Sequence, residues 1–126
     1  MPFLRSVALK RSLDDAPLAF SFSVPVVHAL PELRFPTAVT FFVGENGSES
    51  RPCQSQLALL SMLEQMASED SQFIIATHSP ILLAFPDATI YSFDEIPARV
   101  EAYEDLDHVR VTRDFLQAPE RYLRQL

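Results

Sequence analysis

Three short apolar runs along the chain predict buried β-strands. Residues 39–43 (VTFFV), 72–77 (QFIIAT) and 88–93 (ATIYSF) are rich in β-branched and aromatic side chains and lack the strict alternation of a strand with one wet face. Residues 3–10 (FLRSVALK) do alternate apolar and polar positions, which predicts a half-buried strand. A further strand at residues 99–103 is expected to pair beside the third run.

A different period predicts helices between and after these runs. Residues 54–67 place apolar side chains on one face of a helix, namely Leu59, Met62, Leu63 and Met66. Ser79 is a favourable N-cap and Pro80 a favourable first residue, so a short helix is expected after the second run. Residues 107–116 and 119–126 predict two terminal helices.

The order of these elements predicts an α/β fold, with a short parallel sheet, flanking helices and an N-terminal strand region. The helix at residues 54–67 would link two parallel strands by a right-handed crossover. Residues 12–36 carry four prolines and predict an irregular segment with one short strand at residues 19–23. With 126 residues, the chain is expected to form a single domain.

Gly44 and Gly47 are the only two glycines, and they follow the first apolar run directly. A buried strand that ends in G-x-x-G can direct backbone N–H groups at a phosphate. The sequence GENGSES begins the phosphate-binding pattern G-x-x-x-x-G-K-[ST] and then departs from it. Glu49, Ser50 and Arg51 stand where the pattern has glycine, lysine and a hydroxyl. On its own, GENG is a weak signal, and a tight turn between a core strand and a loop is the favoured explanation.

His78 follows the second apolar run, in the sequence IIATHSP. The carboxyl end of a strand in an open α/β sheet is the edge where ligands bind. A histidine that merely packs at a strand end is the alternative interpretation, and the residue alone does not decide between the two.

Taken together, GENGS and ATHSP resemble the corresponding motifs of ABC-type P-loop ATPases of the AAA family, the soluble SMC- and RecF-like group of small bacterial ATPases. The resemblance covers two blocks, residues 3–48 and 54–126, and includes the tail YEDLDHVRVTRDFLQAPERYLRQL. It implies a reduced P-loop NTPase-like core and a catalytic switch role for His78. The ATP-binding residues that it implies are Gly44, Glu45, Asn46, Gly47 and Ser48.

Residues 49–53 join the two blocks directly, where family members carry the rest of Walker A, the Q-loop, the ABC signature and the Walker B strand. The resemblance therefore implies one truncated P-loop ATPase-like domain over residues 1–126. Phosphoryl transfer depends on the Walker lysine, on Mg²⁺ and on a positioned water. We expect ATP binding that is weak or lost, little basis for Mg²⁺ binding, and no ATP hydrolysis by the chain alone.

The resemblance also predicts the strand order. VTFFV would lie between QFIIAT and ATIYSF, with one sheet edge exposed where outer strands are missing. Because an exposed edge invites pairing with another chain, the alternative function is a non-catalytic interaction module. It would act with a second copy or with a full-length family member. A truncated gene product without a selected function is a third interpretation.

Charge and composition limit the other function classes. The formal net charge of −7 argues against direct nucleic-acid binding. The N-terminal residues reach charged positions too soon for a signal peptide, and no run approaches the roughly 20 apolar residues of a membrane span. The protein is therefore expected to be cytoplasmic and to bind no membrane.

The remaining candidates for chemistry have simpler explanations. Cys53 is the only cysteine, so it forms no intramolecular disulfide, and it is interpreted as a buried or incidental thiol. His28 and His108 have no neighbours at ligand spacing along the chain. Adjacent acid pairs such as Asp94 and Glu95 are typical of solvated turns.

Overall fold

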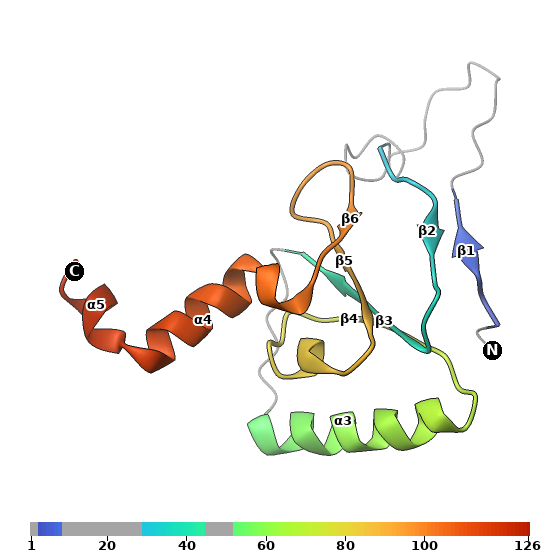
Figure 1. The fold of residues 1–126 in the computed structure, drawn as a ribbon, viewed down its shortest axis with the longest axis horizontal. Coiled ribbons are helices and arrows are strands. Elements are labelled where there is room, and N and C mark those ends of the chain that lie inside the picture. The colour runs from blue at the N-terminus through green and yellow to red at the C-terminus, as the bar shows by residue number, and fades with distance from the viewer. Residues whose placement is uncertain (1–2, 9–28, 45–51) are drawn as a thin grey trace.

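The structure is a computed structural model that describes residues 3–8, 29–44 and 52–126. Its centre is a four-stranded sheet in the order β4-β3-β5-β6 (Figure 1). The strands are β3 (Val39–Val43), β4 (Phe73–Ala76), β5 (Thr89–Ser92) and β6 (Arg99–Val100). β3 runs parallel to β4 and β5, whereas β6 is antiparallel to β5. The fold is therefore mixed α/β with a mixed sheet, and the predicted central place of VTFFV is confirmed.

Three α-helices occur in the described part of the chain: α3 (Cys53–Ser68), α4 (Asp107–Gln117) and α5 (Pro119–Leu123). All three were predicted from the pattern. The helix expected after Ser79 is a single 3₁₀ turn, η1 (Leu82–Ala84), and a second such turn, η2 (Tyr103–Asp105), precedes α4. The predicted strand at residues 19–23 lies outside the described residues.

The first face of the sheet carries the main hydrophobic core. Side chains that alternate along β3 point into it, and α3, η1 and the start of α4 cover them. Its fully buried members are Val39, Phe41, Val43, Leu82, Leu83, Ile90, Leu106 and Val109. Figure 1 shows α3 running beneath the sheet, where it forms the predicted crossover between β3 and β4.

The second face is covered by a small antiparallel sheet of β1 (Ser6–Val7) and β2 (Leu33–Arg34). Tyr91 joins the two sheets, since its hydroxyl donates to the carbonyl of Arg34 and accepts from the N–H of Arg34, both at 2.8 Å. Leu33, Phe35 and Tyr91 form the core here, packed against Phe42. The strand predicted at residues 3–10 is shorter than expected, and residues 3–8 are exposed rather than half-buried.

The prediction that QFIIAT is fully buried is wrong. β4 lies at the edge of the sheet, and its side chains alternate between half-buried and exposed, with Ile74 40% exposed. Phe73 and Ile75 face the main core. Ile74 and Ala76 face the second side of the sheet, where β1 and β2 leave β4 partly uncovered. An apolar run indicates that a strand can be buried, but the elements that pack around the strand decide whether it is buried.

The predicted apolar face of the crossover helix is partly wrong as well. Leu63 is buried and Leu59 packs against the core, as expected. Met62 and Met66 are 48% and 37% exposed instead. The buried face is turned toward Gln56 and Leu60, and Gln56 accepts a hydrogen bond from the hydroxyl of Ser79 beside η1.

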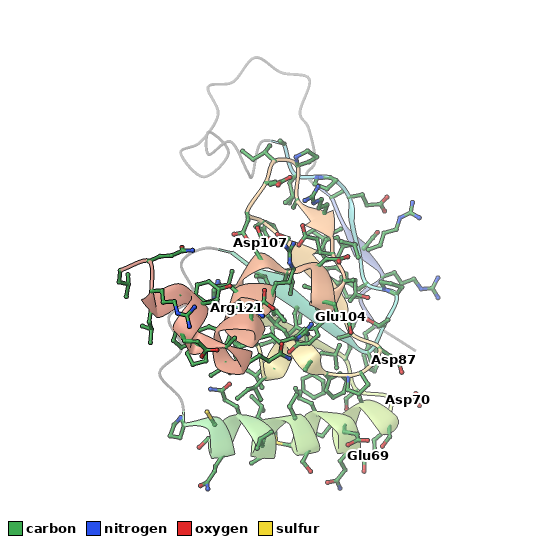
Figure 2. The ribbon with its side chains drawn as sticks, turned by 60° about the vertical axis from the view of Figure 1, so that its left-hand side comes forward. Glu69, Asp70, Asp87, Glu104, Asp107 and Arg121 are labelled. Carbon is green, nitrogen blue, oxygen red and sulfur yellow. The ribbon has the colours of Figure 1, made fainter. Side chains whose placement is uncertain are left out.

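The C-terminal helices extend away from the sheet (Figure 1). Only the beginning of α4 is anchored, through Leu106 and Val109 in the main core. Figure 2 labels Asp107 at the start of α4 and Arg121 on α5, and Figure 1 shows that α5 lies farther from the sheet than the start of α4 does. Beyond the anchor, α4 and α5 expose several apolar side chains, namely Val111, Phe115, Leu116, Tyr122 and Leu123.

Candidate functional site

The candidate site lies at the carboxyl ends of β3 and β4. Phe42 pairs with Ala76, and the N–H of Thr77 donates to the carbonyl of Phe42 at 3.0 Å. Gly44 directly follows β3, and His78 follows β4 after Thr77, so both lie at this carboxyl edge of the sheet. The structure therefore places two sequence-predicted positions, 34 residues apart in the chain, after neighbouring strands at the same edge of the sheet.

Gly44 has a limited role in the backbone geometry that the structure describes. Its φ is not positive, and a Cβ built on it would meet only the Cβ of Phe93, at an ordinary 3.9 Å. Its own conformation therefore does not require glycine. Glu45, Asn46, Gly47 and Ser48, the other predicted phosphate-binding residues, lie outside the described residues.

The backbone around His78 is fixed by hydrogen bonds on both sides. The N–H of Ser79 donates to Oγ1 of Thr77 at 3.1 Å, and Oγ of Ser79 accepts from the N–H groups of Ile81 and Leu82 at 3.2 Å each. These bonds confirm the predicted cap. Because Thr77 and Ser79 are both buried, the position of His78 between them is set by the core rather than by solvent.

His108 is the residue that analysis of the sequence missed. Its ring stacks on that of His78, with 4.0 Å between the ring centroids and 25° between the planes. The two residues lie 30 positions apart, at the end of β4 and in the first turn of α4, so local spacing carried no signal of the contact. His108 has no neighbour at ligand spacing along the chain, and only the fold brings it against His78.

The environment of His108 disfavours its charged form. Burial lowers the pKa of His108 below its usual value, and the neighbouring charge of His78 lowers it further. The carboxylates of Asp94 and Asp107 and a hydrogen bond to the His78 backbone act in the opposite direction. Nε2 of His108 is buried and has no hydrogen-bond partner among the described residues.

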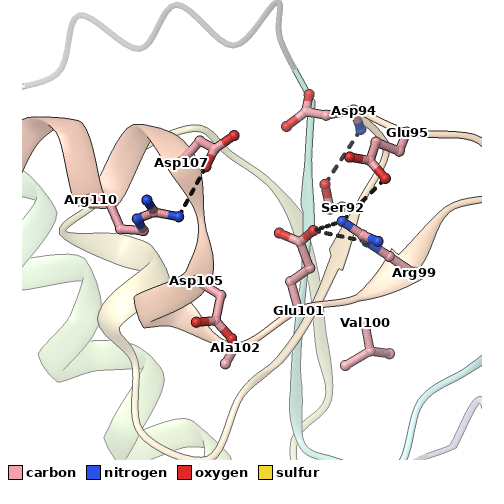
Figure 3. Close-up of a pocket in the computed structure, with 10 residues that line it drawn as sticks. All are labelled: Ser92, Asp94, Glu95, Arg99, Val100, Glu101, Ala102, Asp105, Asp107 and Arg110. Atoms are coloured by element: carbon pink, nitrogen blue, oxygen red, sulfur yellow. Dashed lines mark hydrogen bonds and ion pairs between the residues drawn. The ribbon is translucent and has the colours of Figure 1, made fainter.

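A hollow of about 510 Å³ opens where β5, β6 and the start of α4 meet (Figure 3). Arg99 pairs with Glu95 at 3.2 Å and with Glu101 at 3.0 Å. Arg110 pairs with Asp107 at 3.5 Å. Because the lining also contains Asp94 and Asp105, carboxylates outnumber the two arginines and the hollow is unsuited to a triphosphate.

No metal site accompanies these residues in the part of the chain that the structure describes. Within it, no group of three or more His, Cys, Asp or Glu side chains could hold a metal ion. Cys53 is exposed at the first position of α3, so of its two interpretations, a buried or an incidental thiol, the first is wrong. Arg51 lies outside the described residues.

Comparison of the chain with protein-family models, with curated proteins and with solved structures finds no match. None of the described helices is long and apolar enough to cross a membrane.

Proposed function

We propose that the chain binds the phosphate groups of ATP weakly at the carboxyl edge of β3 and β4 and that it does not hydrolyse ATP by itself. The observation that supports this proposal is the parallel pairing of β3 with β4, because Gly44 directly follows β3 and His78 follows β4 after one residue. The carboxyl edge of parallel strands is the usual ligand-binding edge of α/β sheets. The resemblance of GENGS and THSP to motifs of ABC-type P-loop ATPases names the ligand.

The proposal assigns separate roles to the two sides of this edge. Gly44 and the residues after it would approach the phosphates through the backbone, and His78 would donate a hydrogen bond from its ring. The acidic hollow beside β5 would repel a triphosphate and limit the affinity. No lysine follows the glycines, so the charge that normally balances the β- and γ-phosphates is missing and hydrolysis is not expected.

The experiment is a titration of fluorescent ATP into the purified protein, with and without Mg²⁺. We expect saturable binding with a dissociation constant near or below about 100 μM. The variant His78→Ala should weaken it by about tenfold, which is the size of a lost hydrogen bond to a charged group. Phe3→Ala, which removes an exposed ring near the opposite end of the sheet, is the matched control and should bind as the wild type does.

Absence of saturable binding by a folded protein would overturn the proposal. So would equal affinity of the His78→Ala variant and the wild type, because the bound nucleotide would then lie elsewhere. Release of inorganic phosphate from Mg²⁺-ATP above the buffer rate would contradict the second half of the proposal.

A further inference from the structure

The outer edge of β4 carries backbone groups that bond to no other residue in the described part of the chain. The N–H of Phe73 donates to the carbonyl of Ala38 at 2.7 Å, and the N–H of Thr77 donates to the carbonyl of Phe42 at 3.0 Å. Backbone groups alternate in direction along a strand, so those of Ile74 and Ala76 point away from β3. Among the described residues, no strand pairs with this edge.

The chemistry of this edge differs from that of the opposite edge of the sheet. β6 has only two residues, and Arg99 in it forms ion pairs with Glu95 and Glu101. Short strands and charged side chains are the usual protection of a sheet edge. Residues 72–77 contain no charged side chain, so β4 lacks that protection.

One side of α3, which carries the exposed Met62 and Met66, faces the same way as the outer edge of β4. Met62 and Met66 are each two positions from Glu64, so at 100° per residue they lie on the opposite side of the helix. The two methionines are four positions apart, so they lie on the same side as each other. Glu64 lines a pocket with Phe85 and Asp87, on the side of η1 and β5. The two methionines therefore face the side on which β4 ends the sheet.

We propose that two copies of the chain form a dimer in which β4 pairs antiparallel with β4 of the second copy. The two-fold axis passes near Ile75 and is perpendicular to the sheet. Ile74 and Ala76 then exchange backbone hydrogen bonds with Ala76 and Ile74 of the other copy, and two four-stranded sheets become one of eight strands. Pairing an edge with itself in this way gives a closed, isologous interface.

A second copy fits this surface better than an unrelated strand does. An axis perpendicular to the sheet keeps both α3 helices on the same face, so the same operation brings the Met62 and Met66 flank against its own counterpart. Methionine side chains adapt readily to such a contact. The interface contains no charge from residues 72–77, so the net charge of −7 on each copy is not concentrated at it. This dimer does not depend on nucleotide binding.

Sedimentation velocity over a wide range of protein concentration, without nucleotide, tests the proposal. We expect a monomer–dimer equilibrium in the wild type. Ile74→Lys should raise the dimer dissociation constant by at least about tenfold, because two like charges then meet near the axis. Val100→Lys adds the same charge to β6, where the side chain is exposed, and should leave the equilibrium unchanged. Circular dichroism and thermal melting check that both variants fold.

Cross-linking tests the geometry independently. In a Cys53→Ser background, Met66→Cys should be captured as a covalent dimer by a short bis-maleimide. Leu57→Cys lies on the opposite flank of α3, is also exposed, and should remain monomeric. A wild type that stays monomeric at all concentrations would overturn the proposal. Equal loss of dimer in the Val100→Lys variant, or equal cross-linking through position 57, would overturn it as well.

Discussion

The stacked rings of His78 and His108 join the end of a core strand to the first turn of a C-terminal helix. At 4.0 Å between centroids, two charged imidazoles would repel each other. The pKa of His108 is lowered first by burial and second by the charge of His78, so its charged form is disfavoured in the same way. The contact is therefore a point where protonation acts on the packing of α4.

The sign of the resulting pH dependence follows from linkage. Because the pKa of His108 is lower in the folded state, the unfolded chain binds more protons below its own pKa of about 6.5. The stability that His108 contributes as a neutral group is present above that pH, and it is lost as the pH falls toward the lower folded-state pKa. We expect His108→Asn to reduce the loss of unfolding free energy between about pH 7.5 and pH 5, as measured by urea denaturation.

Carboxylates also titrate in this range, so the test is the difference between the variant and the wild type. Parallel pH profiles for the two proteins would show that His108 does not contribute. A steeper loss in the variant would mean that Asp94 and Asp107 dominate its surroundings.

At the level of elements, α4 is held to the body by very few residues. Leu106, which precedes the helix, and Val109 in its first turn are buried in the main core. The rest of the helix is largely exposed, and Leu116 is 73% exposed. The anchoring of both C-terminal helices therefore depends on the contacts made before and within the first turns of α4.

This uneven anchoring gives a prediction for a matched pair of leucines. Leu106→Ala removes a side chain that is 1% exposed and should lower the unfolding free energy by about 2–5 kcal/mol. Leu116→Ala makes the same chemical change on the exposed part of α4 and should stay within about 0.5 kcal/mol of the wild type. Urea denaturation followed by circular dichroism measures both, and similar losses in the two variants would mean that the distal helix is packed.

Two elements show where the pattern of apolar positions was sufficient and where it was not. The run VTFFV is a central strand, and its predicted burial is confirmed. QFIIAT has nearly the same pattern and is half-exposed, because it ends the sheet. In α3 the helical period is correct, but the buried face is turned away from Met62 and Met66, toward Gln56 and Leu60.

At the scale of the whole molecule, acidic side chains are spread over several elements. Figure 2 shows Glu69 and Asp70 at the end of α3, Asp87 after η1, and Glu104 and Asp107 before and at the start of α4. With a formal net charge of −7, the chain as a whole repels a phosphate backbone. This repulsion of a nucleic-acid polymer by the whole chain does not exclude the weak binding of a single nucleotide at Gly44 and His78.

We therefore expect no saturable binding of duplex or single-stranded DNA at a salt concentration of about 150 mM, and none at about 50 mM, where electrostatic attraction would be strongest. Fluorescence anisotropy with labelled oligonucleotides measures this. Binding that weakens steeply with added salt would contradict the prediction, because it would reveal a cationic surface that the net charge conceals.

The sequence by itself determined the element types, the strand character of the three apolar runs and the cap at Ser79. These are local properties, set by side-chain period and by hydrogen bonds within a few residues. The strand order was also predicted, through the resemblance to P-loop ATPases, and the pairing of β3 with β4 and β5 confirms it.

Only the tertiary structure decided which faces are covered and which distant residues meet. It left Ile74 exposed at an edge, turned the methionines of α3 outward and stacked His108 on His78. Each of these outcomes depends on contacts between segments far apart in the chain, which neither apolar period nor motif spacing encodes. Burial and side-chain contacts depend on how the sheets and helices pack against one another, so they are decided only in the folded protein.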